Sequence, residues 1–206
     1  ALIVVQDGIS AQKLLFDLQL FYGENVAVYP ERELIFYDIE AQAKDIITQR
    51  MTVLEGLSQT SGGAPLVIAT ISAVMGPSLP KDAFEKRIIF KQGSIYNMQT
   101  LAEKFISLGY VRENIVEGKG QFSIRGGIID FYPHGEELPV RVELFGDEID
   151  SIRNFDPLTQ RSLDALEEAT AAPAGEILIS PKVLEKLIPK LKKFTDTKDE
   201  TLSIDG

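Results

Sequence analysis

The sequence contains no cysteine, only one histidine and no long hydrophobic run. Without cysteine there is no disulfide, no thiol nucleophile and no zinc–thiolate site, and the lone His134 has no partners for a metal site. No segment approaches the roughly 18 consecutive apolar residues of a membrane-spanning helix, and no signal-peptide pattern is recognisable. We therefore expect no membrane contact, and a cytoplasmic location fits this composition.

The motifs of nucleotide chemistry are missing as well. No G-x-x-x-x-G-K-[ST] motif occurs, so nothing here is expected to bind a triphosphate in the manner of a P-loop. No helix is expected after the Gly118–Gly120 turn, and Asp147–Asp150 fits a hairpin turn better than an acidic nucleotide box. No nucleophile and base form a recognisable pair. We therefore predict no catalytic, cofactor-binding or metal-binding residue and no cofactor in this chain.

The chain has fewer basic than acidic side chains, and its arginines are unevenly distributed along the sequence. The chain has 21 Lys and Arg against 31 Asp and Glu, a net charge of -10. Because DNA binding depends on cations that neutralise phosphates, the surface as a whole is a poor candidate for binding DNA. Six of the eight arginines nevertheless lie within residues 81–161. Arginine is enriched in protein–protein interfaces, so this segment is the best candidate for a docking surface.

Hydrophobic patterning in residues 1–80 predicts a parallel α/β layer. The predicted order is strand, helix, strand, helix, strand, over residues 1–5, 11–22, 26–29, 41–57 and 65–70. This alternation is typical of right-handed crossovers in a parallel sheet. We expect the apolar run at residues 1–5 to be buried on both faces, and Ser10 to cap the first helix. A chain that opens on such a strand without Met is expected to be a fragment of a longer protein.

The sequence pattern of residues 81–166 predicts an α+β domain inserted into the α/β domain. Pro77 and Pro80 mark the boundary, and a helix capped by Asn97 ends at Gly109. Short strands separated by tight turns then favour an antiparallel sheet. The predicted strands cover residues 87–91, 111–116, 121–125, 127–132, 139–145 and 148–153.

Residues 167–206 are expected to return to the α/β domain. We predict an Ala/Pro-rich link from residue 167, a short strand at residues 177–179 and a lysine-rich helix over residues 181–194. The lysines of this helix more simply form a solvated face than a phosphate site. They are Lys186, Lys190, Lys192 and Lys193.

Strand alternation predicts that Arg125, Arg141 and Phe145 share one exposed face. In residues 139–145 the apolar positions 140, 142 and 144 take one side, which leaves Arg141, Glu143 and Phe145 on the other. In residues 121–125, Ser123 and Arg125 point outward by the same rule. Arginine beside an exposed aromatic ring is typical of an interface hot spot. The alternative, in which Phe145 packs under the adjacent turn and Arg141 pairs with a cross-strand acid, stays equally open.

The chain resembles the UvrB-homology module, most closely in the run GQFSIRGGIIDFYPHGEELPVRVELFGDEIDSIRNFDPLTQRS. This module is shared by the excinuclease component UvrB and the bacterial transcription-repair coupling factors (Mfd). The resemblance continues upstream through YPERELIFYDIEAQAKDIITQRMTVLEGL and IATISAVMGPSLPKDAF. UvrB carries a tyrosine-rich hairpin where this chain runs from Phe36–Asp38 straight to the helix at Ala41. The resemblance is therefore closer to the amino-terminal module of the coupling factors.

The resemblance implies an incomplete, vestigial RecA-like α/β domain with an inserted domain that binds UvrA, another component of the excinuclease. By motif, the family's UvrA-binding residues fall on Arg125, Arg141 and Phe145, so the chain is expected to be a non-catalytic adaptor in transcription-coupled nucleotide excision repair.

The whole parent protein would be an ATP-dependent translocase on double-stranded DNA that removes stalled RNA polymerase. Its ATP and Mg would be bound by motor domains outside this chain, and other domains of the same protein would mask the UvrA surface. The alternative is a fragment of a UvrB-like ATPase that handles damaged DNA.

Overall fold

The computed structural model describes residues 1–32, 40–58, 65–176, 178, 185, 187–189 and 191, and of residues 40–43 only the backbone. The chain divides into two units, Ala1–Glu176 and Ile177–Gly206. In the second unit the described residues 185, 187–189 and 191 are helical. The run Phe36–Asp38 and the four lysines of the predicted last helix lie outside the described residues, as does most of the predicted strand at 177–179. The predicted domain boundaries at residues 80 and 166 stay a prediction.

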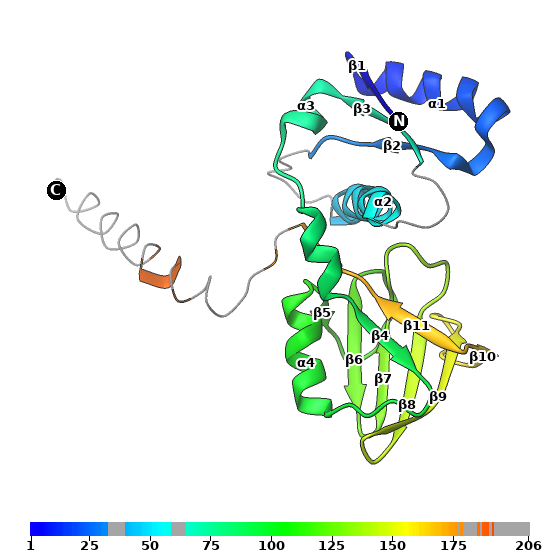
Figure 1. The fold of residues 1–206 in the computed structure, drawn as a ribbon, viewed down its shortest axis with the longest axis vertical. Coiled ribbons are helices and arrows are strands. Elements are labelled where there is room, and N and C mark those ends of the chain that lie inside the picture. Colours follow the sequence, from blue (N-terminus) through cyan, green and yellow to red (C-terminus); the bar gives the residue numbers. More distant parts are fainter. Residues whose placement is uncertain are drawn as a thin grey trace, which may run out of the picture. The chain divides into compact units, whose positions relative to one another are not determined.

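Three parallel strands form the first sheet, in the order β1-β3-β2. They are β1 (Leu2–Val5), β2 (Val26–Tyr29) and β3 (Leu66–Thr70). Helix α1 (Gly8–Tyr22) packs Ala11 against Ile68 on one side of the sheet. Helix α2 (Glu40–Ser58) packs Val53 against Val67 on the other, so that the two helices enclose the sheet (Figure 1). The predicted parallel α/β layer is confirmed, whereas its assignment to a RecA-like fold stays a prediction.

Two expectations for this layer are wrong. Among the described strands, β1 lies at the edge of the sheet and pairs with β3 alone, and Leu2 and Val4 are 55% and 48% exposed, so β1 is not buried on both faces. Asp7, not Ser10, caps helix α1: its carboxylate accepts a hydrogen bond of 2.7 Å from the Ser10 N–H. The helix therefore begins three residues earlier than expected, because Asp is as good a cap as Ser and lies just upstream.

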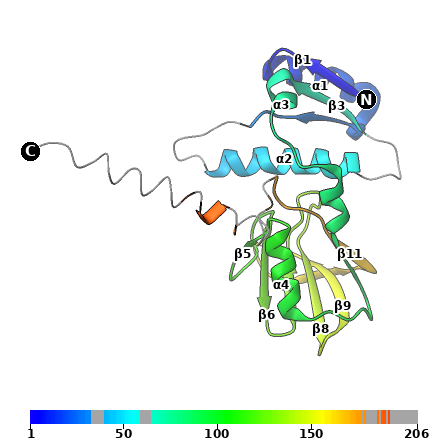
Figure 2. The same ribbon diagram turned by 60° about the vertical axis from the view of Figure 1, so that its left-hand side comes forward.

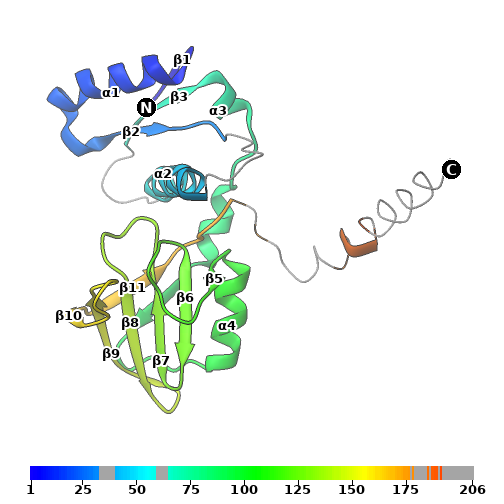
Figure 3. The ribbon, with the colours of Figure 1, turned by 180° about the vertical axis from the view of Figure 1, so that it is seen from behind.

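The second sheet has six strands in the order β10-β9-β8-β7-β6-β5 (Figure 3). Its strands are β5 (Val111–Arg112), β6 (Gln121–Arg125), β7 (Ile128–Phe131), β8 (Val140–Phe145), β9 (Glu148–Phe155) and β10 (Ser162–Ala165). All neighbours are antiparallel except β5 and β6, which are parallel. The predicted antiparallel sheet is confirmed, with one parallel edge added.

A core rich in aromatic side chains lies under this sheet. Helix α4 (Met98–Ser107) contributes the buried Phe105, whose ring stacks on Phe122 at a centroid distance of 5.0 Å. Phe90 and Phe131 complete the cluster. As predicted, Asn97 caps α4 by accepting hydrogen bonds from two N–H groups of its first turn.

Strands β4 (Ile88–Lys91) and β11 (Glu168–Ala171) form a separate two-stranded antiparallel sheet. Residues 168–171, expected to begin an Ala/Pro-rich link, therefore form a strand instead. Strand β11, with the sequence EATA, contains no large apolar residue, but Ala169 and Ala171 are small enough to pack closely on the core of the six-stranded sheet. Alanine is depleted in strands, so the pattern gave no strand signal.

The remaining short helices are α3 (Ile71–Met75), η1 (Gly23–Asn25) and η2 (Lys81–Lys86). No helix in the described part of the chain is long and apolar enough to cross a membrane.

Polar contacts connect helix α2 to the second half of the first unit (Figure 2 shows α2 along its length). Arg50 on α2 forms a two-point ion pair with Glu176, with N–O distances of 2.9 and 2.7 Å. Thr48, two residues earlier, contacts Nδ1 of His134 at 3.0 Å. Arg50 and His134 are 1% and 6% exposed. Both contacts are therefore protected from water.

Candidate functional site

Two arginines of the six-stranded sheet share one buried carboxylate. Asp130 on β7 lies directly opposite Arg141 on β8 and one strand away from Arg125 on β6. Arg141 donates from Nε to Oδ1 at 2.7 Å and from Nη2 to Oδ2 at 2.9 Å. Arg125 donates from Nη2 to Oδ2 at 2.7 Å. The side chain of Asp130 is 1% exposed, so these charge-assisted bonds fix both guanidinium groups on the same side of the sheet.

Arg141 is enclosed by its neighbours. Its Nη1 donates to the carbonyl oxygen of Gln160 at 3.1 Å, and its guanidinium lies 4.6 Å from the ring centroid of the buried Phe155. Only 13% of the Arg141 side chain is exposed. Hydrogen bonding to Asp130 raises the pKa of Arg141, although burial acts in the opposite direction. This arginine is a fixed part of the surface.

Arg125 is more open than Arg141. Its side chain is 48% exposed, and Asp130 is its one hydrogen-bond partner among the described residues. A guanidinium group has five N–H donors, so most of those on Arg125 face solvent. Arg153, also exposed, lies opposite Arg141 in the register of β8 and β9. Three arginines therefore lie on this side of the sheet, together with the carboxylates of Asp130 and Glu143.

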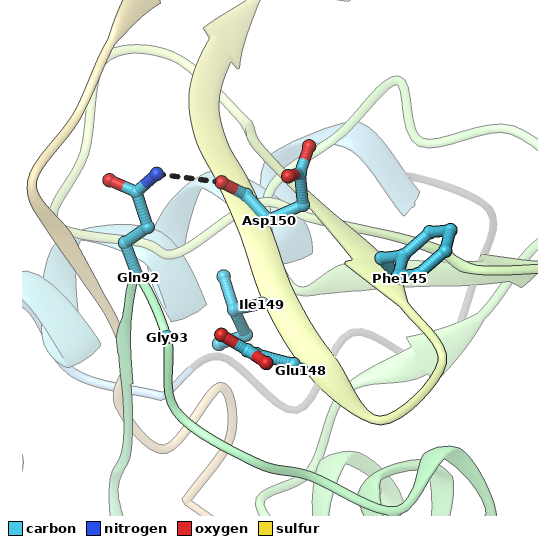
Figure 4. A pocket seen from close by; sticks show the side chains of 6 residues that line it. All are labelled: Gln92, Gly93, Phe145, Glu148, Ile149 and Asp150. Carbon is cyan, nitrogen blue, oxygen red and sulfur yellow. Dashed lines mark hydrogen bonds between the residues drawn. The ribbon is translucent and has the colours of Figure 1, made fainter.

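Phe145 lies at the end of β8 and is 87% exposed. Its neighbour Leu144 packs on the core, so strand alternation puts Phe145 on the same side of the sheet as Arg141. We call the surface formed by Arg125, Asp130, Arg141 and Phe145 the outer face. Phe145 lines a groove of about 490 Å³, and Figure 4 shows its ring beside the β8–β9 hairpin. The groove is lined by Gln92, Gly93, Phe145, Glu148, Ile149 and Asp150.

The structure brings the three residues singled out in the sequence to one side of the sheet. Of the alternative interpretation, one half is right, because Arg141 does pair with a cross-strand acid, and the other half is wrong, because Phe145 does not pack under its turn. Ser123, expected to be solvent-exposed, is 2% exposed, since its hydroxyl donates to the carbonyl of Asn114 in a covering loop. The binding role of Arg125, Arg141 and Phe145 stays a prediction.

From the sequence we did not predict Asp130 as part of the outer face, nor Phe155 and Gln160 as the residues that enclose Arg141. Asp130 gave a signal, because it is the one polar residue in the strand IIDF. Gln160 gave none: it contacts Arg141 only because the turn that begins at Asp156 folds back, with Gln160 at φ 61°.

The outer face has the composition of a recognition surface. Exposed guanidinium donors suit carboxylates of a partner, and an exposed ring suits an apolar pocket. Within the described residues, no group of three or more His, Cys, Asp or Glu is placed to hold a metal ion. The absence of catalytic, cofactor and metal sites stays a prediction.

Comparison with known proteins shows that the segment carrying this surface matches a known protein family. Residues 88–176, which include the whole outer face, match the family described as the UvrB interaction domain. The chain is 37% identical over 183 residues, 88% of its length, to the transcription-repair-coupling factor of Bacillus subtilis strain 168. It is 33% identical to the corresponding factors of Staphylococcus aureus strain Mu50 and Staphylococcus epidermidis, over 93% of its length in both cases. The chain spans 15–16% of the length of these relatives. Residues 88–176 therefore match the UvrB interaction domain family, within a longer segment that is homologous to transcription-repair-coupling factors.

Proposed function

We propose that this chain is the non-catalytic adaptor of a transcription-repair coupling factor, and that it recruits UvrA through Arg125, Arg141 and Phe145. One observation carries the proposal: an almost fully exposed phenylalanine lies on the same side of the sheet as two guanidinium groups, inside the segment that matches the UvrB interaction domain. The proposed role is recognition in nucleotide excision repair, without chemistry of its own.

The ring and the charges would play different parts in this recognition. Covering the exposed ring of Phe145 in an apolar pocket would remove a large apolar area from water and anchor the complex. Arg125, with most of its donors facing solvent, would then select a partner surface that carries carboxylates.

We extend the proposal to the parent protein. It would be an ATP-dependent translocase on double-stranded DNA that displaces stalled RNA polymerase, with ATP and Mg bound in motor domains outside these residues. The parallel layer with helices on both faces supports the assignment of residues 1–80 to an incomplete RecA-like domain. The relatives named above are coupling factors, which favours this account over a UvrB-like ATPase.

The test is a titration of purified UvrA with the wild-type chain, Phe145→Ala and a matched control. Phe21→Ala serves as the control, because Phe21 is 82% exposed but belongs to α1 and not to the outer face. Loss of a true anchor costs about 2 kcal/mol or more, a fall in affinity of roughly 30-fold. We expect this loss for Phe145→Ala alone. Equal affinities for the three folded proteins, or no binding by the wild type, would contradict the proposal.

A further inference from the structure

Asp130 is the residue on which the geometry of the outer face depends. It lies on the central strand β7, between the strands that carry the two arginines, and accepts three hydrogen bonds of 2.7–2.9 Å from them. With 1% of its side chain exposed, it offers almost no surface to a partner. We infer that Asp130 is a positioning residue that sets Arg125 and Arg141 in the arrangement that the partner recognises. This inference rests on the proposed function.

The shared carboxylate gives the two arginines different roles. Three of the nitrogens of Arg141 already donate, two to Asp130 and one to Gln160, and its guanidinium stacks on Phe155. Arg141 is thus the enclosed arginine of the pair, with 13% of its side chain exposed. Arg125 is the open one, with 48% of its side chain exposed to solvent. Arg125 is the arginine that meets the partner most directly. Arg141 contributes mainly by fixing Asp130, and through it Arg125.

Preorganisation is the physical gain from this arrangement. A free arginine side chain loses about 2 kcal/mol of rotamer entropy when it is immobilised. Arg125, already fastened at Nη2, has lost part of this entropy before the partner arrives. Asp130 also lies between two like charges that would otherwise repel each other and move apart.

Positioning and simple charge make opposite predictions for Asp130→Asn. The substitution removes a negative charge from the outer face, so a mechanism based on net charge predicts tighter binding of a carboxylate-bearing partner. The positioning role predicts weaker binding, because the amide neither holds two guanidinium groups nor neutralises their repulsion. Glu143→Gln is the matched control: Glu143 is next but one to Arg141 on β8, and its carboxylate accepts from Ser151.

The experiment measures the affinity of purified UvrA for the wild-type chain, Asp130→Asn, Asp130→Glu and Glu143→Gln, with thermal unfolding of each. We expect affinity to fall at least tenfold for Asp130→Asn and for Asp130→Glu, which keeps the charge but moves it, and to change less than threefold for Glu143→Gln. The Asp130→Glu variant keeps the inference testable if Asp130→Asn does not fold. In spectra of the arginine Nε–H groups, the signal of Arg141 should move strongly in both Asp130 variants and much less in Glu143→Gln, because Asp130 accepts from Nε whereas Glu143 acts on Arg141 only through its charge.

The possible failures are distinguishable. If the wild type does not bind UvrA, the proposed function is wrong. If Phe145→Ala weakens binding while folded Asp130 variants bind as the wild type does, only the positioning role is wrong. If Asp130→Asn binds more tightly, net charge accounts for the surface. In an Arg125→Ala background, Asp130→Asn should have a smaller effect on affinity, and an equal effect would indicate a purely structural role.

Discussion

At the scale of single residues, His134 has a structural role that the sequence did not reveal. Its Nδ1 lies 3.0 Å from the hydroxyl of Thr48, and its Nε2 lies 2.9 Å from the carbonyl oxygen of Ala174. A carbonyl only accepts, so Nε2 carries a proton. In the neutral ring, Nδ1 then accepts from the hydroxyl of Thr48. Burial lowers the pKa of His134, with a smaller contribution from the charge of Lys119.

The free energy of unfolding should therefore rise with pH as the medium passes from the lowered pKa of His134 up through its ordinary value of 6.5. In this window the unfolded chain binds a proton that the folded chain does not, which gives a slope of at most about 1.4 kcal/mol per pH unit. We expect His134→Asn to lack this slope. The measurement is urea unfolding of both proteins at several pH values between 5 and 7.5.

Glu55, whose pKa burial raises, contributes a slope of opposite sign. It does so in both proteins, so the difference between them isolates the histidine, which is the only one in the chain. Parallel pH profiles would show that His134 does not titrate with folding.

The residues of the outer face were predictable to different degrees. Alternation in PVRVELF is enough to separate Arg141 and Phe145 from the buried valines, because the side-chain period of a strand is two. Alternation predicted an exposed Phe145 as one of two open alternatives, and the choice between them, like the enclosure of Arg141, depends on contacts between strands. The polarity of Asp130 was visible in IIDF, but its two partners follow from the register of three strands.

At the scale of elements, the turn between β6 and β7 imposes a strict requirement on Gly127. A Cβ atom at this position would lie 2.7 Å from the carbonyl oxygen of Leu144, closer than any ordinary contact. The N–H of Leu144 also donates to the carbonyl of Gly127 at 2.7 Å. The turn that follows Arg125 is thus packed on the strand that ends in Phe145.

We expect Gly127→Ala to lower the free energy of unfolding by about 1–3 kcal/mol, because the backbone of β8 must move away from the new methyl group. The control is Gly126→Asn. Gly126 has φ 59°, and a Cβ atom added to it would have no neighbour within 4 Å. Asn tolerates this backbone conformation better than most other residues. Denaturant unfolding of both variants checks this, and a Gly126→Asn that is as unstable as Gly127→Ala would contradict the explanation.

Most helices and strands follow from the sequence, and the exceptions have physical causes. Strong signals such as the Asn97 cap give α4 correctly. Strand β11 was missed because its alanines have no intrinsic strand preference and are fixed by packing against the core. Strand β1 has the apolar composition of a central strand but occupies an edge, and sheet order is not visible in a local pattern.

At the scale of the whole first unit, Arg50 and Glu176 connect residues 126 positions apart in the sequence. Both side chains are 1% exposed, and the guanidinium also lies 4.0 Å from the ring centroid of Tyr29. Burial alone would raise the pKa of Glu176, but hydrogen bonds and charges from Arg50 and Arg32 outweigh burial and lower it. The stability that this carboxylate contributes is therefore present above its ordinary pKa of 4.5 and is lost as pH falls through the lowered value.

Removing one member of this pair leaves a buried charge without its partner. We expect Arg50→Met to lower the free energy of unfolding by about 3–5 kcal/mol. The double variant Arg50→Met, Glu176→Leu should lose much less than the sum of its two single variants, because neither charge is then left buried alone. A double-mutant cycle by urea unfolding measures this coupling, and additive losses would show that the pair does not act as a unit.

The docking of UvrA on the outer face can be observed by hydrogen–deuterium exchange of the chain with and without purified UvrA. We predict slower exchange at amides of the β6–β7 turn beside Arg125 and of the β8–β9 hairpin that carries Phe145, with little change in α1. Phe145→Ala should abolish the protection. Protection confined to α1 and the three-stranded sheet, with both turns of the outer face unchanged, would contradict this mode of docking.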